Sequence, residues 1–341
     1  MFPYKTLVDS YKHLSAHPRR WKTLYYISNT RIYEKFTNIH STKLCYDKIY
    51  DQMEQYDPDV VISVHPTMNY LPERITREIA KKRGKYVPFF TVVTDFGSGH
   101  CTWFQGKPNK VFIASDRIKA LASKRGVGLN DENLVMAGLP IRGDFAVHAK
   151  KMGSRTTVEG EEYRHQIQRE LGLSPEKKTV LIMGGGEGVG SLGEITEKIY
   201  LELKKKGVDA TICVVCGRNE KLKKEFEEKD WDDLYVKHDE KKRTSKRRKL
   251  KHFITGREKY ANDVVEKESN VDVIGLGFVT NMADYMVASD ILVSKAGPGT
   301  IAEAAAVGLP VMITRYVNCN DYFLIVIKIF ISRIDIGCFY H

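Results

Sequence analysis

The stretch from Asp290 to Ile313, "DILVSKAGPGTIAEAAAVGLPVMI", decides the fold class. Its apolar run Ile291–Val293 is typical of a buried strand, and the small residues that follow Gly299 are typical of a closely packed helix. A second apolar run follows Gly308. A strand, a glycine-rich turn, a helix and another strand form a unit that is built around a parallel sheet.

The same alternation recurs along the chain. Further strand-like segments lie within 59–66, 86–93, 109–115, 133–145, 178–190, 210–219 and 271–279, with helix-like segments between most of them. We expect an α/β fold of two doubly wound, Rossmann-like domains. The expected divisions are a first domain over 1–143, a linker and first helix over 144–175, a second domain over 176–315 with an insertion at about 237–270, and a divergent tail over 316–341. Ligands of such sheets bind at the carboxyl ends of the strands, and here also between the domains.

The positive charge of the chain is concentrated in one segment. The formal net charge is +11, and Lys237–Lys259 alone holds eleven Lys/Arg and three Asp/Glu. A nearly balanced protein with one basic insertion is therefore favoured over a nucleic-acid-binding protein. No apolar run reaches the ~20 residues that a membrane-spanning helix needs, and the first residues lack a signal-peptide pattern. If the protein works at a membrane, we expect it to lie on the surface.

The six cysteines are scattered, which is typical of a reducing compartment rather than a disulfide framework. Cys213 and Cys216 form a CxxC pattern inside an apolar strand. That spacing on a strand directs the two side chains to opposite faces. We therefore expect both to be buried structural residues rather than redox or metal-binding groups.

A first glycine-rich loop, "MGGGEGVGS" at 183–191, follows a strand and opens a helix. Glycines at this place let backbone N–H groups approach an anion, and the helix dipole favours negative charge. The spacing fits neither a Walker A loop nor the GxGxxG pattern, so phosphate binding and a simple tight turn remain equal alternatives. Further along, the backbone at Phe278 and Val279 in the segment "GLGFV" could read the edge of a base.

A second such loop is "KAGPGTIAEA" at 295–304. Gly297 and Gly299 expose the backbone and Thr300 can cap the helix, which leaves N–H groups that suit a diphosphate. Glu303, one turn into the helix, could accept two hydrogen bonds from a ribose diol, or it could simply complement the helix dipole. Two glycine loops in one α/β domain favour a nucleotide site.

The first predicted domain carries polar residues where two of its strands end. The loop "TVVTDFGSGHCTWF" supplies Asp95, His100 and Trp103, and His65 with Pro66 ends another strand. An acid, an imidazole and an aromatic ring at such an edge suit acceptor binding or proton transfer. Ordinary loop hydrogen bonds are the favoured alternative for a lone histidine or aspartate.

Seven motifs, in order along the chain, resemble the monogalactosyldiacylglycerol synthase family. They are "SVHPTMNYLPERI", "TVVTDFGSGHCTWF", "GLPIRGDF", "LIMGGGEGVG", "VVCGRN", "GFVTNM" and "KAGPGTIAEA". The resemblance runs from about Tyr4 to about Ile313 and is interrupted by the basic insertion. The wider group includes bacterial diacylglycerol glucosyltransferases and the muramyl-peptide N-acetylglucosaminyltransferase.

The resemblance implies a GT-B glycosyltransferase whose two domains face a cleft. It would transfer galactose from UDP-galactose to 1,2-diacylglycerol with inversion, in peripheral contact with membrane lipid at the plastid (chloroplast) envelope. No cofactor or metal ion is implied, because helix N-termini stabilise the leaving diphosphate. The donor-site residues that match the family are Gly185, Gly186 and Glu187 in the first loop, Phe278 and Val279 beside the base, Gly297, Pro298, Gly299 and Thr300 at the diphosphate, and Glu303 at the ribose.

Two departures from the family pattern bear on activity. The family's glycine-rich loop with an essential histidine does not occur in this sequence, which leaves Asp95 and His100 as candidates for the general base. The sugar-holding segment beyond Ile313 is replaced by the tail, so we expect a chain truncated at both ends. His65, Pro66 and Trp103 remain candidates for the acceptor side.

Two other functions stay open at this point. A diacylglycerol glucosyltransferase would share the same motifs, because the sugar-selecting segment is missing. A non-catalytic, basic protein at a membrane surface would use the Lys/Arg insertion to attract anionic lipid, although a solvated loop is the favoured interpretation of that composition.

Overall fold

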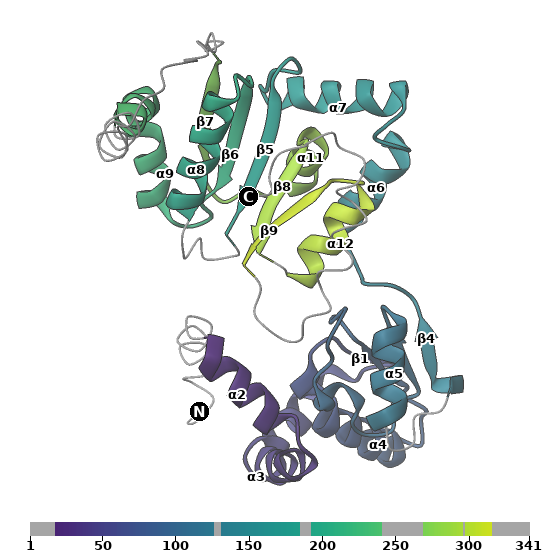
Figure 1. The fold of residues 1–341 in the computed structure, drawn as a ribbon. Coiled ribbons are helices and arrows are strands. Elements are labelled where there is room, and N and C mark those ends of the chain that lie inside the picture. Colours follow the sequence, from purple (N-terminus) through teal and green to yellow (C-terminus); the bar gives the residue numbers. More distant parts are fainter. Residues whose placement is uncertain (1–17, 126–130, 185–191, 241–268, 296, 316–341) are drawn as a thin grey trace. The chain divides into compact units, whose positions relative to one another are not determined.

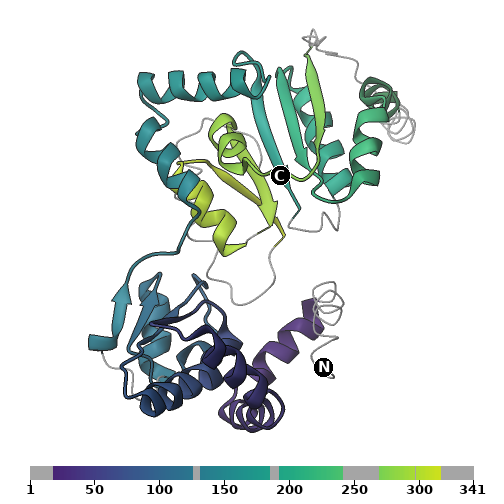
Figure 2. The same ribbon diagram turned by 180° about the vertical axis from the view of Figure 1, so that it is seen from behind.

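The structure is a computed structural model that describes residues 18–125, 131–184, 192–240, 269–295 and 297–315. The chain forms two compact units: the first runs to Ile141 and includes Pro298–Ala302, and the second comprises Arg142–Gly297 and Glu303–Arg315. Each unit contains one sheet in which every strand pair is parallel (Figures 1 and 2). The predicted α/β fold class with parallel sheets is therefore confirmed.

The first sheet has the strand order β1-β2-β3-β4. Its strands are β1 (Val61–Ser63), β2 (Phe89–Val92), β3 (Lys110–Ile113) and β4 (Leu134–Met136). The helices of this unit are α2 (Pro18–Ser28), α3 (Arg31–Tyr56), α4 (Tyr70–Arg83) and α5 (Asp116–Arg125), and the short 3-10 helices are η2 (Pro66–Met68), η3 (Cys101–Phe104) and η4 (Asp131–Asn133). Because the strands are parallel neighbours, the chain leaves β1 and β2 at the same edge.

Local sequence explains the main helices of the first unit. Thr30 caps α3 by accepting a hydrogen bond from the backbone N–H of Tyr33. The second half of α3 packs on α4 around the buried side chains Leu71, Ile75 and Ile79. Helix α4 ends at Arg83, and its C-cap Gly84 has a φ of 62°, a left-handed conformation that suits glycine.

The second sheet has the strand order β7-β6-β5-β8-β9. Its strands are β5 (Lys178–Met183), β6 (Ala210–Val215), β7 (Val271–Leu276), β8 (Ile291–Lys295) and β9 (Val311–Arg315). Its helices are α6 (Gly143–Met152), α7 (Val158–Glu170), α8 (Leu192–Lys205), α9 (Glu220–Glu228), α11 (Met282–Ala288) and α12 (Pro298–Ala306), and residues 231–240 are also helical.

The order of this second sheet reverses between β5 and β8. Strands β6 and β7 extend the sheet on one side of β5, and β8 and β9 extend it on the other, with Val180 paired to Ile291 across the junction. Connections leave a reversal point in opposite directions, which opens a crevice at the carboxyl edge where ligands bind. Helix α8 contacts β5, β6 and β7, whereas α11 contacts β5 (Figure 1).

The core of the second unit confirms the prediction for the two cysteines. Cys213 and Cys216 are fully buried beside strand residues such as Ile212 and Val214. Burial raises the pKa of the Cys213 thiol to about 12, and it raises that of Cys216 to about 11. Both side chains are therefore protonated, unreactive components of the core.

The segment expected to link the domains, 144–175, is largely helical. Helices α6 and α7 occupy most of it, and Thr157 caps α7 through the backbone N–H of Gly160. The polar residues of this segment lie on the solvent-facing sides of these helices, since Phe145 and Met152 are buried. Along the described parts of the chain, no helix is long and apolar enough to cross a membrane.

Candidate functional site

The start of α12 is the element that the sequence singled out. Gly297 occupies the N-cap position with φ −81° and ψ 129°, makes no side-chain cap, and is followed by Pro298 at the first helical position. The prediction that Thr300 caps the helix is wrong, because Thr300 is the third residue of α12. The first N–H groups of a helix have no acceptor within the helix, so this uncapped end suits an anion.

Glu303 could complement the dipole of α12 only from the first turn of the helix, and it lies beyond that turn. It is the sixth residue of α12, and the first turn of that helix holds no acidic residue. Its carboxylate instead receives two hydrogen bonds from Arg142, Nε to Oε1 at 2.7 Å and Nη2 to Oε2 at 2.9 Å. Glu303 is therefore held by a long-range ion pair, which the sequence did not reveal.

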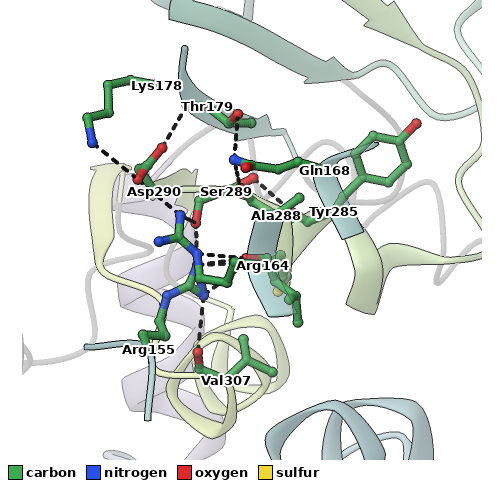
Figure 3. A network of polar contacts seen from close by, with 12 residues as sticks. Arg155, Arg164, Gln168, Lys178, Thr179, Tyr285, Ala288, Ser289, Asp290 and Val307 are labelled. Atoms are coloured by element: carbon green, nitrogen blue, oxygen red, sulfur yellow. Dashed lines mark hydrogen bonds and ion pairs between the residues drawn. The ribbon is translucent and has the colours of Figure 1, made fainter. Parts of the chain in front are cut away.

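A second arginine fixes the opposite end of α12 (Figure 3). The Arg155 guanidinium donates to the carbonyl of Val307, just after α12, at 3.1 Å. It also donates to carbonyls at the end of α11, namely Met286 at 3.3 Å, Val287 at 2.8 Å and Ser289. Because the carbonyl ends of two helices carry partial negative charge, one cation between them joins the helices.

The buried position of Arg155 disfavours the charged form of its guanidinium. Burial, and next the charge of Arg164, lower the pKa of its guanidinium to about 9. Arg164 is paired with Asp290 at 3.0 Å, and Asp290 accepts the backbone N–H of Thr179 at 2.8 Å (Figure 3). The network thus connects α7, α11, β5, the start of β8 and the end of α12.

The predicted base-reading segment lies at the end of the outer strand β7. The Phe278 ring is 67% exposed, and the Arg218 guanidinium, which follows β6, stacks over it with Cζ 5.7 Å from the ring centroid. Gly275 in the same segment packs closely against α9, because an added Cβ would lie 3.0 Å from the Lys223 carbonyl oxygen. Phe278 and Val279 thus stand at the carboxyl edge that the sequence predicted.

The two ends of the predicted donor site are separated along that edge. Strand β7, which precedes Phe278, and strand β8, which precedes α12, are three strand spacings apart, or about 14 Å. Only an extended ligand lying across the ends of β6 and β5 could contact both. The first glycine loop leaves β5 between them, but Gly185, Gly186 and Glu187 lie outside the described residues.

In the first unit, the structure brings Asp95 and His65 to one edge. Asp95 follows β2 and accepts a hydrogen bond from the indole N–H of Trp103 at 2.7 Å. Burial raises the pKa of the Asp95 carboxyl, against the opposing effects of the Trp103 hydrogen bond and His65. His65 and Pro66 start η2, and the exposed His65 ring caps it through the N–H of Thr67. Trp103 itself is a core residue, 1% exposed.

His100 occupies a different environment. Its Nδ1 lies 2.8 Å from the Thr102 hydroxyl, and its Nε2 lies 3.1 Å from the Ser28 hydroxyl at the end of α2. Burial, and next the charge of Arg125, lower the pKa of the imidazole. With both ring nitrogens engaged, His100 ties α2 to η3, which is the role of a structural histidine.

Three arginines at this site received no role from the sequence. Arg142 and Arg218 lie inside the recognised motifs "GLPIRGDF" and "VVCGRN", so their position in a motif was a usable signal. Arg155 carried no such signal, because its acceptors are backbone carbonyls more than a hundred residues away. Within the described ranges, no group of three or more His, Cys, Asp or Glu side chains could hold a metal ion.

Comparison with known proteins agrees with this arrangement. The family model for monogalactosyldiacylglycerol (MGDG) synthase matches residues 1–141, and that for the glycosyltransferase family 28 C-terminal domain matches residues 233–316, which include α12. The monogalactosyldiacylglycerol synthase 1, chloroplastic, of Arabidopsis thaliana is 29% identical over 93% of this chain and 50% of its own length. The chloroplastic synthase of Spinacia oleracea is 28% identical over 93% and 51%.

The chain therefore spans about half the length of the curated relatives that it matches. Among solved structures it is similar to the crystal structure of Acinetobacter baumannii MurG, with 15% identity, a TM-score of 0.40, and coverage of 78% of this chain and 55% of that one. The two family models follow each other in the order of the two structural units, and the synthases align along nearly the whole chain. Residues 1–141 match the monogalactosyldiacylglycerol synthase family model, and the chain is similar to chloroplastic synthases over 93% of its length.

Proposed function

We propose that this protein is a GT-B glycosyltransferase that moves galactose from UDP-galactose to 1,2-diacylglycerol with inversion. The observation that carries the proposal is the uncapped, glycine-rich start of α12 at the carboxyl edge of the second sheet, with Glu303 beyond it. It lies within the segment that matches the glycosyltransferase family 28 domain. The names of the relatives supply the galactolipid product.

In this proposal each donor residue has a physical task. The N–H groups at Gly299 and Thr300 take the diphosphate, aided by the α12 dipole. Glu303 takes the ribose hydroxyls, and the backbone at Phe278 and Val279 takes the base. Gly185, Gly186 and Glu187 in the first glycine loop match the donor-site residues of the family. They lie outside the described residues.

The reaction needs one proton transfer. The lipid hydroxyl attacks the anomeric carbon, the bond from that carbon to the diphosphate oxygen breaks, and the hydroxyl proton passes to a base. His100 is poorly suited to this task, because both ring nitrogens are engaged in structural contacts. Asp95 is the remaining candidate, because burial raises its pKa and so strengthens its carboxylate as a base.

For the membrane we propose the exposed face of α3 as the contact. Ile32, Phe36 and Ile39 are 84%, 64% and 69% exposed and recur on one side of the helix, with the exposed Lys35 and Lys43 beside them. Apolar side chains flanked by cations are typical of helices that lie in a lipid interface. We also propose a place at the plastid envelope; the names of the plant relatives, which are chloroplastic enzymes, support the plastid part of this proposal.

The test is a transfer assay with the full chain. Labelled UDP-galactose or labelled UDP-glucose is supplied with diacylglycerol in mixed vesicles, and the glycolipid is measured for the natural protein and for Glu303→Gln. We expect transfer by the natural protein and a loss of about tenfold or more in kcat/KM for the variant, which lacks a charged acceptor for the ribose. Transfer of glucose in preference to galactose would identify a diacylglycerol glucosyltransferase instead. Absence of transfer from either donor would refute the proposed activity.

A further inference from the structure

The pair formed by Arg142 and Glu303 has a geometry that ordinary surface ion pairs lack. Nε of Arg142 donates to one carboxylate oxygen of Glu303 and Nη2 donates to the other, at 2.7 and 2.9 Å. Two parallel hydrogen bonds between planar groups fix the plane of the carboxylate as well as its position. The contact joins the residue before α6 to the second turn of α12.

Arg142 is itself held in place. Its guanidinium lies over the ring of Phe145, with Cζ 5.0 Å from the centroid, and Phe145 is 1% exposed. A loose pair between two flexible surface side chains contributes little, because holding both of them in place costs entropy. Here the arginine rests on a core residue and the Glu303 side chain is 13% exposed, so the carboxylate has a defined orientation before any ligand arrives.

The pairing leaves part of the carboxylate available. Each carboxylate oxygen has two acceptor positions, and Arg142 occupies one on each oxygen. One acceptor position per oxygen therefore remains for two neighbouring hydroxyl donors. A ribose carries such a pair in its 2′- and 3′-hydroxyls.

We propose that Arg142 is a positioning residue that sets the plane of the Glu303 carboxylate so that its remaining lone pairs accept both ribose hydroxyls of a bound nucleotide. This inference rests on the proposed function, which places the nucleotide at α12. Arg142 acts through Glu303 and touches neither the base nor the sugar that is transferred.

The experiment compares two nucleotides that differ only at the ribose. UDP and 2′,3′-dideoxy-UDP are titrated by calorimetry into the full chain, its variants Arg142→Gln, Arg142→Lys and Glu303→Gln, and the double variant. The natural protein should bind UDP roughly tenfold or more tightly than the dideoxy form, because the ribose hydroxyls donate to a charged acceptor. In Arg142→Gln this preference should fall to within about threefold, with the affinity for dideoxy-UDP unchanged.

Two variants sharpen the interpretation. Arg142→Lys keeps the charge but cannot donate in parallel to both oxygens, so it should give an intermediate preference. The double variant should lose no more preference than Glu303→Gln alone, because Arg142 acts only through that carboxylate. Lys177→Gln is the matched control: it removes an ion pair of the same unit, with Asp272 at 2.5 Å, at the opposite edge of the sheet, and it should leave both affinities unchanged.

The contrary outcomes are distinct. If Arg142→Gln keeps the natural preference for UDP, or weakens both nucleotides equally, Arg142 does not position the carboxylate. If the same change strengthens UDP binding, the arginine competes with the ribose and the inference is wrong. If the natural protein binds neither nucleotide, the proposed function fails and the inference fails with it, a result that is visible before any variant is measured.

Discussion

At the scale of single residues, the two candidate bases Asp95 and His100 differ in the groups that surround them. Asp95 and His100 belong to one loop of the first unit, and either side chain could in principle accept a proton. The structure gives His100 a hydroxyl neighbour at each ring nitrogen, whereas Asp95 is half-buried beside Trp103 near the end of β2. His100 is therefore a structural residue, whereas the Asp95 carboxylate remains available to accept a proton.

The position of His100 makes the stability of the first unit sensitive to acid. Its pKa is lowered in the folded chain, so below about pH 6.5 the unfolded chain binds more protons than the folded one. Its contribution is fully present above that unfolded pKa and is lost as the pH falls through it towards the lowered folded pKa. We expect the free energy of unfolding to fall less between about pH 7.5 and about pH 5 in His100→Gln than in the natural protein.

Denaturant unfolding at the two pH values measures this difference. His165→Gln, on α7 in the second unit, is the control for the loss of a histidine. If the natural protein and His100→Gln show the same pH dependence, then His100 is not held in its neutral form by its surroundings.

At the level of elements, α12 is defined by contacts at both of its ends. Arg142 holds Glu303 in its second turn, and Arg155 collects the carbonyl of Val307 after its last turn. The same Arg155 guanidinium satisfies carbonyls at the end of α11 (Figure 3). Two helices that follow different strands thus share one cation.

Removal of that cation should loosen both helices. For Arg155→Met we expect a loss of about 3 kcal/mol in the free energy of unfolding, because several carbonyls lose a charged donor in a poorly hydrated place. Urea unfolding of the full chain measures the loss. Arg169→Met, an exposed arginine on α7, makes the same replacement and should change the stability by less than about 0.5 kcal/mol. Equal effects of the two substitutions would show that the network of Arg155 contributes nothing specific.

These elements also show which features of the structure could be predicted from the sequence alone. The strand ends, the glycine-rich start of α12 and the burial of Cys213 follow from local patterns, because period and turn residues act over a few positions. The pairing of Arg142 with Glu303 joins residues 161 positions apart, and no local pattern encodes it. The place of Thr300 was misjudged because Gly297 and Pro298 start the helix earlier than a side-chain cap would.

On the scale of the whole molecule, the two units contribute different chemistry. The first unit matches the synthase family model and carries Asp95 and the apolar, basic face of α3. The second carries Glu303 and most of the segment that matches a glycosyltransferase domain. Under the proposed function, lipid contact and donor binding are therefore separable by mutation.

Vesicle sedimentation tests that separation. We expect Phe36→Ser combined with Ile39→Ser to weaken binding to vesicles that contain phosphatidylglycerol by about tenfold or more, because two large apolar side chains no longer enter the lipid. UDP affinity should stay unchanged. Val158→Ser, which removes an exposed apolar residue of the second unit, is the control. Unchanged vesicle binding by the double variant would exclude α3 as the contact.

The outer position of β7 has a consequence for the length of the chain. Residues 241–268 separate the helical residues 231–240 from β7, which among the described strands pairs with β6 alone. The entropy of closing a connection grows with the logarithm of its length, at about 0.6 kcal/mol for each doubling. An insertion before an edge strand therefore costs little free energy. Strand β6 lies between β7 and β5 and separates the insertion point from the crevice between β5 and β8. The protein can acquire or lose a basic segment at this place while the nucleotide-facing edge keeps its register.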